Sequence, residues 1–174
     1  MAFVAPETGM GVRRQLTLFL AGEMAAAVEA VRRVVDPEQY RLIPAHVTLC
    51  REEELAGIPI EELEARIAAG PARRITLEFG RAELFDGHGI QVRCVAGGAE
   101  YQALRELVLG SREIARPRPH VTLAHPRNPR APGNSLEAAQ ALPPRWQARL
   151  AWIHLIAQEG AQPWRRLAMF DLSV

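Results

Sequence analysis

The stretch Pro44-Ala45-His46-Val47-Thr48-Leu49 decides the fold, because it recurs later in the chain as Pro119-His120-Val121-Thr122-Leu123. The two histidines are 74 residues apart, and each phrase begins with a proline. Side chains alternate across a strand, so each histidine shares a face with its threonine while the valine and leucine face the core. We therefore predict short strands at residues 46–50 and 119–124. As equivalent parts of two similar lobes, they would bring their four polar groups to one cleft.

The sequence around these phrases predicts strands and helices in alternation. Alternating, β-branched sequence predicts strands, and apolar residues at helical spacing predict helices. Asp86-Gly87-His88-Gly89 is typical of a hairpin turn. The order predicts a single α+β domain, residues 1–174, with mainly antiparallel sheets and outer helices. Further strands are expected at residues 15–20, 74–85, 90–95, 149–158 and 164–172, and helices at 21–35, 60–69, 99–109 and directly after Ser135.

The composition excludes several classes of protein. The 174 residues carry 21 basic and 20 acidic side chains, so no bulk positive charge holds nucleic acid. The chain contains no lysine, which excludes a Schiff-base enzyme, a Walker-type phosphate loop and a ligase that carries its nucleotide on lysine. Two cysteines make neither a disulfide framework nor a four-thiolate metal site. Residues 1–14 lack a secretory signal, and no apolar stretch approaches the ~20 residues that span a bilayer. We expect a soluble, reduced, cytoplasmic protein without a membrane partner.

Two imidazoles and two hydroxyls in one cleft suit the cleavage of a phosphodiester. A neutral histidine can take a proton from the attacking oxygen, and a protonated histidine can give one to the leaving oxygen. Each threonine hydroxyl, about 7 Å along the strand from its histidine, can donate to a non-bridging phosphate oxygen. The residues do not distinguish the acid from the base. This chemistry requires neither a metal nor another cofactor.

The paired phrases, their separation and the alternation of strands and helices resemble the 2H phosphoesterase superfamily. That group includes the bacterial 2′-5′ RNA ligase and cyclic phosphodiesterase proteins. The resemblance covers nearly the whole chain and implies a bilobal fold of two sheets, related by a pseudo-two-fold axis, around a central groove. It implies metal-independent chemistry on 2′,3′-cyclic phosphates or 2′-5′ phosphodiesters. It also implies that His46 and His120 are the acid/base pair and that Thr48 and Thr122 hold the phosphate.

A basic segment around the second phrase is a candidate rim for an anionic ligand. Residues 116–130 contain four arginines, two histidines and no acidic residue. Arg118 or Arg127 is placed to reach a phosphate or a terminal nucleotide. Ligase-like members of the family often have an arginine soon after the second Thr-Leu. In this chain His125 and Arg127 follow instead, and we expect them to contact substrate.

Two aromatic residues are further candidates to contact a nucleotide. Tyr40 and Phe85 lie in or beside loops and are candidates to stack on a base.

The sequence leaves three functional hypotheses open. The first hypothesis is an enzyme that opens 2′,3′-cyclic phosphates of RNA ends or nucleotides, with reversible ATP-independent 2′-5′ ligation. The second is a non-catalytic module that binds phosphorylated RNA ends or nucleotides, and in either case we expect a monomer. The third joins His46, His120 and His125 at a metal ion, but no carboxylate accompanies them and His125 should point away from His120.

Overall fold

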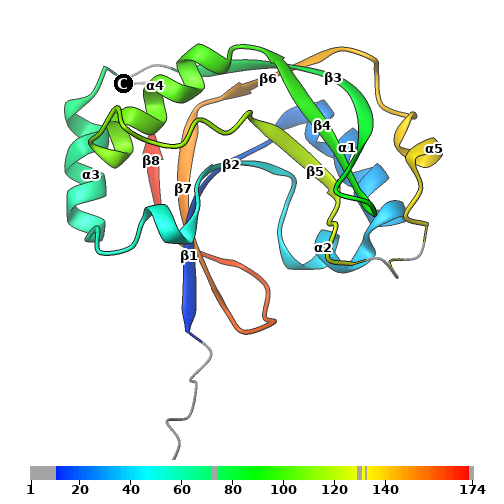
Figure 1. Cartoon of the computed structure of the whole chain (residues 1–174), viewed down its shortest axis with the longest axis horizontal. Coiled ribbons are helices and arrows are strands. Elements are labelled where there is room, and N and C mark those ends of the chain that lie inside the picture. The colour runs from blue at the N-terminus through cyan, green and yellow to red at the C-terminus, as the bar shows by residue number, and fades with distance from the viewer. Residues whose placement is uncertain (1–10, 72–73, 129–130, 132, 173–174) are drawn as a thin grey trace, which may run out of the picture.

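The computed structural model describes residues 11–71, 74–128, 131 and 133–172, and it has the α+β architecture expected from the sequence (Figure 1). Residues 1–10, where part of the secretory-signal argument falls, and part of the basic segment lie outside the described residues. In chain order, the elements are β1 (Val12–Phe19), α1 (Gly22–Val35), α2 (Pro37–Leu42), β2 (His46–Cys50), the 3-10 turn η1 (Glu52–Glu54), α3 (Ile60–Ala69), β3 (Ile75–Phe85), β4 (Gly89–Ala96), α4 (Gly98–Leu109), β5 (His120–Ala124), α5 (Leu136–Ala139), β6 (Trp146–Leu150), β7 (Trp152–Glu159) and β8 (Arg165–Asp171).

The strands of the described residues form an eight-stranded antiparallel sheet in the order β6-β3-β4-β5-β2-β1-β7-β8. β2 and β5, which carry the repeated phrase, lie side by side at its centre. One register pair, Val47 opposite Val121, joins them, so two four-stranded halves meet at a narrow seam. The sequence analysis expected two sheets. The structure has one eight-stranded sheet instead, because β2 pairs with β5 across the seam, and each expected sheet is one half of it.

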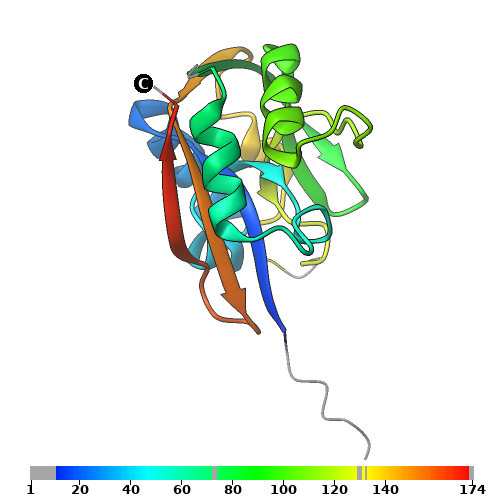
Figure 2. The same ribbon diagram turned by 90° about the vertical axis from the view of Figure 1, so that its left-hand side faces the viewer.

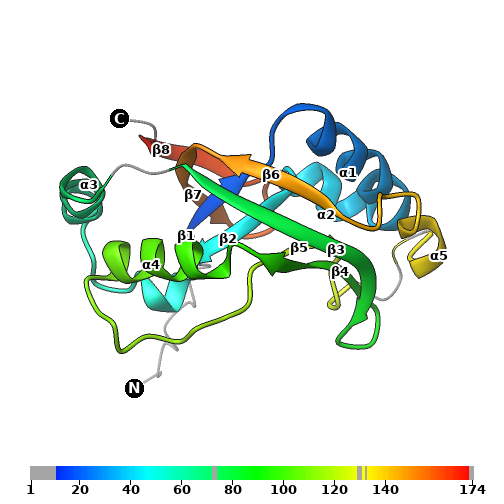
Figure 3. The same cartoon turned by 90° about the horizontal axis from the view of Figure 1, so that it is seen from above.

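The repeated phrase belongs to a larger repeated unit of strand, helix and motif strand. β1, α1 and β2 form one unit, and β4, α4 and β5 form the other. Figure 3 shows α1, α2 and α5 on one side of the molecule and α3 and α4 on the other, with the strands between them. Each long helix contacts the motif strand of the opposite half, α1 touching β5 and α4 touching β2. This crossed packing brings two distant phrases together.

The helix α1 ends where the sequence predicts, but the chain enters a further helix at once. Val28 and Val35 are buried on its inner face. Asp36 leaves the helical conformation, and its side chain accepts a hydrogen bond from the Gln39 backbone N–H at 3.1 Å, capping α2. Pro37 occupies the first turn, where its missing N–H has no helical partner to lose. Asp36-Pro37 is therefore a helix start as well as a stop, and the sequence analysis missed α2.

One segment that was expected to form a single strand contains parts of two strands. Residues 149–158 are divided between the end of β6 and most of β7, with the break at Ala151. β6 pairs with β3 at one edge of the sheet, whereas β7 pairs with β1 in the other half. On β6, the buried Trp146 ring stacks on Phe79 with centroids 4.4 Å apart. Because apolar strand-forming residues lie on both sides of Ala151, periodicity does not show the change of half.

The core lies behind the repeated phrases. Val47, Leu49, Val121 and Leu123 are all fully buried, as alternation along β2 and β5 predicts. Figure 2 looks onto β8, β7 and β1 with α3 in front of them, and α3 contributes the buried Leu63 to the core. Among the helices that the structure describes, none is long and apolar enough to cross a membrane.

Candidate active site

The strand register brings the polar side chains of both phrases to one face of the sheet. Antiparallel pairing joins the two motif valines, so each histidine lies across from the threonine of the other phrase. The valines are fully buried, whereas the histidines and threonines are partly exposed on the opposite face. The two histidines thus occupy diagonal corners of the site. All four polar side chains line one groove of about 450 Å³: His46, Thr48, His120 and Thr122.

Each of these histidines is oriented by the backbone carbonyl two residues before it. His46 Nδ1 lies 2.8 Å from the Pro44 carbonyl oxygen, and His120 Nδ1 lies 3.2 Å from the Arg118 carbonyl oxygen. A carbonyl oxygen only accepts, so Nδ1 donates in both rings. The lone pair of the neutral imidazole is therefore on Nε2 in both cases. Each ring keeps one nitrogen that accepts a proton when neutral and donates one when charged.

The surroundings favour the neutral form of both rings. Burial lowers the pKa of His46 to about 4; its carbonyl hydrogen bond acts the other way, and the charges of Arg32 and His120 lower the pKa further. Burial also lowers the pKa of His120; its hydrogen bond opposes this, and the charges of Arg51 and Arg93 add to it. The shift at His46 is the larger of the two. A first proton taken up by the pair therefore resides mainly on His120.

A phenylalanine packs on each of the two rings. Phe19 lies opposite His46 in the β1–β2 register and meets it edge-on, with centroids 6.2 Å apart. Phe85 ends β3 and its ring centroid lies 5.7 Å from that of His120. Such aromatic contacts restrict the rotation of both imidazoles. Phe19 also contacts His154, which is buried on β7 and does not line the groove.

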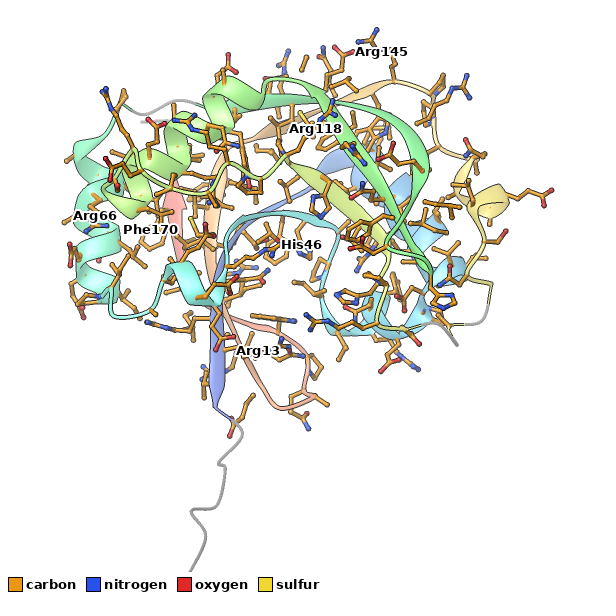
Figure 4. All side chains as sticks on the ribbon, viewed as in Figure 1. Arg13, His46, Arg66, Arg118, Arg145 and Phe170 are labelled. Atoms are coloured by element: carbon orange, nitrogen blue, oxygen red, sulfur yellow. The ribbon has the colours of Figure 1, made fainter. Side chains whose placement is uncertain are left out.

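Several arginines line the groove, and they differ in whether ion pairs and hydrogen bonds to other residues hold their side chains. Arg32 is buried and tied to the fold, because it pairs with Glu29 at 2.7 Å and donates to the Ile43 carbonyl at 2.8 Å. Its Nε has no hydrogen-bond partner among the described residues. Arg51 and Arg127 also line the groove, and neither makes an ion pair with any residue that the structure describes. Figure 4 places His46 near the middle of the molecule, between Arg13, another lining residue, and Arg118. The acidic lining residues are Glu52, Glu53 and Asp86.

A buried carboxylate fixes the loop that follows β5. Asp36 is fully buried and accepts hydrogen bonds from the His125 backbone N–H at 2.8 Å and from Asn128 Nδ2 at 3.0 Å. The Arg127 backbone N–H donates to His125 Nδ1 at 3.1 Å. His125 Nδ1 therefore carries no proton in this arrangement, and the neutral ring presents Nε2–H as a donor. The loop thus adds a fixed donor and a cation, Arg127, to the groove.

The sequence analysis named four further residues as candidates to contact substrate, and the structure places some of them at the groove and others elsewhere. His125 and Arg127 line the groove, and so does Phe85. Arg118 instead lines a neighbouring pocket, and its Nε donates to the Cys94 carbonyl at 3.0 Å. Tyr40 lies on the exposed side of α2 and is a lining residue of neither cavity, so its contact with substrate stays a prediction. Because the sequence analysis did not predict the helix α2, it assigned Tyr40 to a loop.

Sequence reasoning missed the side chains that position the phrases. On α4, the Tyr101 hydroxyl donates to the Thr48 carbonyl at 2.7 Å, and Arg105 donates to the Leu49 carbonyl and pairs with Glu54. Their only sequence signal is a polar residue on the apolar face of a predicted helix. No three histidine, cysteine, aspartate or glutamate side chains within the described part of the chain are grouped to hold a metal ion.

The fold is that of the 2H phosphoesterase superfamily. In this chain, two neighbouring strands at the centre of the antiparallel sheet each present a His-x-Thr phrase to a common groove. A family model described as the 2′-5′ RNA ligase superfamily matches residues 21–162. The chain therefore belongs to the 2′-5′ RNA ligase superfamily.

Solved structures show the same fold at low sequence identity. E. coli LigT complexed with 3′-AMP is 18% identical over 93% of this chain and 98% of that chain, with a TM-score of 0.62. A protein described as a phosphoesterase is 15% identical over 94% and 100%, with a TM-score of 0.58. TT0787 of Thermus thermophilus is 21% identical over 92% and 97%, with a TM-score of 0.52. A comparison with curated protein sequences finds no match.

Proposed function

We propose that the protein is a metal-independent phosphodiesterase that opens the 2′,3′-cyclic phosphate of a nucleotide or an RNA end, and that it performs reversible ATP-independent 2′-5′ ligation when a 5′-hydroxyl replaces water as the nucleophile. The observation that carries the proposal is the pair of His-x-Thr phrases on adjacent central strands, each with its histidine Nδ1 tied to a backbone carbonyl. Superfamily membership supports it, and LigT has been solved with 3′-AMP, ATP and NADP+. All four groups come from one chain, so we propose a monomer.

In the proposed reaction the two histidines take opposite roles on the two sides of the phosphorus. A water oxygen attacks phosphorus and forms the new P–O bond while His46 Nε2 takes its proton. The P–O3′ bond breaks, and O3′ takes a proton from His120 Nε2, which leaves a 2′-phosphate and a 3′-hydroxyl. The lower pKa of His46 supports this assignment of base and acid. Ligation uses the same steps with a 5′-hydroxyl in place of water.

The remaining groove residues are proposed to bind and orient the phosphate. The Thr48 and Thr122 hydroxyls would donate to the two non-bridging oxygens as charge builds up on them. Arg127 and the Nε2–H of His125 would contact the same phosphate or its neighbour. Proton transfer, positioning and hydrogen bonding are all supplied by side chains, so no metal ion is needed for this chemistry.

Histidine substitution tests the proposal directly. His46→Ala and His120→Ala should each lower kcat for 2′,3′-cyclic AMP by roughly 10²–10⁴-fold, the usual contribution of one acid or base. His88→Ala is the matched control, because His88 is exposed on the β3–β4 turn and should leave kcat unchanged. Excess EDTA should leave kcat of the wild type and of His88→Ala unchanged. Turnover at the wild-type rate in either motif variant, with circular dichroism unchanged, contradicts the proposal.

The alternative is a module that binds phosphorylated RNA ends or nucleotides without turning them over. The pairing of two imidazoles at diagonal corners favours catalysis, because binding alone needs no proton acceptor and donor on either side of the phosphate. Saturable binding of adenosine 2′-phosphate together with no product from 2′,3′-cyclic AMP would support the alternative.

A further inference from the structure

A second cavity of about 240 Å³ opens directly beside the candidate active site. It shares Thr48, Arg51, Glu53 and His120 with the groove, so it begins at the end of the site where Thr48 and His120 lie opposite each other. His46 lines the groove and is not a lining residue of the second cavity. We call this cavity the side pocket. It lies between β2, the helix α4 and the segment that leads into β5. Apart from the residues that it shares with the groove, the side pocket has no role in the proposed reaction.

The lining of the side pocket differs in character from the groove. Leu49, Tyr101 and the prolines 117 and 119 give it apolar walls, whereas the groove is lined mainly by charged and polar side chains. At about 240 Å³ it is smaller than the roughly 300–1,000 Å³ of cavities for drug-sized ligands. A flat heteroaromatic ring with its sugar fits such a space better than a phosphate or a longer chain does.

Two arginines give the side pocket fixed polar groups. Arg118 donates from Nε to the Cys94 carbonyl, so its guanidinium plane is held while its terminal nitrogens make no ion pair within the described residues. Arg105 is only 1% exposed, and its buried Nε has no hydrogen-bond partner among the described residues. The acids of the pocket are Glu53 and Glu54, of which Glu54 is paired with Arg105. A guanidinium face stacks on nucleobases, and a buried unpaired N–H favours a ligand acceptor.

We propose that the side pocket is the nucleoside subsite, which binds the base of the terminal nucleotide with Arg118 against its face. The inference rests on the proposed function, and it deepens that function by naming what the site recognises beyond the phosphate. In the proposed reaction His120 protonates the leaving ribose oxygen, so the ribose lies on the His120 side of the phosphorus. The side pocket is the cavity that continues on that side, and the groove near His46 is then left for water or an acceptor hydroxyl.

The experiment compares two substrates that share the reacting bond. 2′,3′-Cyclic AMP carries the nucleoside, and ethylene phosphate is the same five-membered cyclic phosphodiester without ribose or base. The ratio of their kcat/KM values should be at least about 100 in the wild type. Arg118→Gln should lower this ratio by about ten-fold, as expected for loss of one strong polar contact. Ala115→Trp, which places a large ring at a lining position of the pocket, should lower the ratio at least as much by excluding the nucleoside. Arg116→Gln is the matched control, because its side chain is exposed and paired with Glu106 outside the pocket.

The possible results separate the two proposals. Equal loss of activity on both substrates in Arg118→Gln and Ala115→Trp, or a wild-type ratio near one, overturns the nucleoside subsite while leaving the phosphodiesterase intact. Failure of the wild type to open either substrate overturns the proposed function instead. In that case calorimetry with adenosine 2′-phosphate decides the subsite: weaker binding in Arg118→Gln than in Arg116→Gln supports it, and equal binding overturns it.

Discussion

His46 and His120 make the same backbone hydrogen bond in two different surroundings. On β1, Phe19 lies opposite His46, whereas on β4 the charged Arg93 lies opposite His120. Arg93 is paired with Glu83, so its charge is partly balanced. The shared hydrogen bond gives both rings the same orientation, and the differing neighbours give them unequal proton affinities. A site built from a repeat can in this way hold one acid and one base.

The lowered pKa values predict an acidic optimum for the free enzyme. The active form carries one proton on the pair, so kcat/KM should rise as pH increases through about 4, where His46 loses its proton. It should fall again above the pKa of His120, which lies below the ordinary value of 6.5. The kcat/KM profile for 2′,3′-cyclic AMP should therefore peak below pH 6.5. A peak at pH 7.5 or above contradicts this account of the histidine environments.

A substitution outside the groove should move one limb of that profile. Arg93→Gln removes a positive charge that lowers the pKa of His120, so the alkaline limb should shift to higher pH by a few tenths of a unit. The acidic limb, governed by His46, should stay in place. Arg81→Gln, an exposed change on the neighbouring strand β3, provides the control and should leave both limbs where they are.

At the scale of elements, each half of the sheet is held by a helix of the other half. α4 holds β2 through Tyr101 and Arg105, and the α1–α2 junction holds the end of β5 through Asp36. Arg105 and Asp36 are both buried, and their hydrogen bonds go to backbone groups beside the motif residues. Buried polar groups of this kind fix one geometry, because any shift leaves a donor or acceptor unsatisfied.

The Asp36 contact can be tested by a minimal change. Asp36→Asn turns an acceptor oxygen into a donor NH₂ group that opposes one of its present donors, so we expect a loss of about 1–3 kcal/mol in the free energy of unfolding. Displacement of the His125–Arg127 loop should raise KM for 2′,3′-cyclic AMP several-fold, with a smaller change in kcat. Urea unfolding and steady-state kinetics measure the two effects.

Glu38→Gln is the matched control for this prediction. Glu38 is exposed and also accepts from Asn128, at 3.1 Å, whereas the His125 backbone N–H donates to Asp36. The change should alter the free energy of unfolding by no more than about 0.5 kcal/mol and leave KM unchanged. Equal KM values in Asp36→Asn and the wild type would show that the loop does not depend on Asp36.

Local pattern predicted most elements, and the exceptions have physical reasons. Residues 46–50 and 60–69 form the expected strand and helix with the same bounds, because alternation and helical spacing are complete within them. The helix α2 was missed because six residues give no helical period to detect. The break at Ala151 was missed because the partner strands of β6 and β7, not their own sequence, decide where each begins.

At the scale of the whole molecule, the charge balance predicts a preference for short substrates. The net charge is +1, and the acidic turn η1, with Glu52 and Glu53, lies at the groove. KM for RNA ending in a 2′,3′-cyclic phosphate should therefore stop improving beyond about two or three nucleotides. With two phosphate contacts, affinity should fall with salt at a slope of only about −1.4 on logarithmic axes. A steep slope, or steady improvement up to ten nucleotides, contradicts this prediction.

The candidate site was only partly predictable from the sequence. The motif histidines and threonines are detectable because the phrase is repeated, and alternation shows which face they share. Arg51, Asp86 and Trp164 line the groove from three distant segments, and no local pattern connects those segments to it. Tyr40 lies outside both cavities and Arg118 lines the side pocket instead of the groove, because composition near a motif does not fix the direction of a side chain.

The seam between the halves has a mechanical consequence. Because Val47 and Val121 form the one register pair there, backbone pairing alone contributes little to the spacing of the two halves. The crossed contacts of α1 with β5 and of α4 with β2 therefore carry most of that task. The distance between the two imidazoles, each fixed to its own carbonyl, then depends on helix packing remote from the bound phosphate.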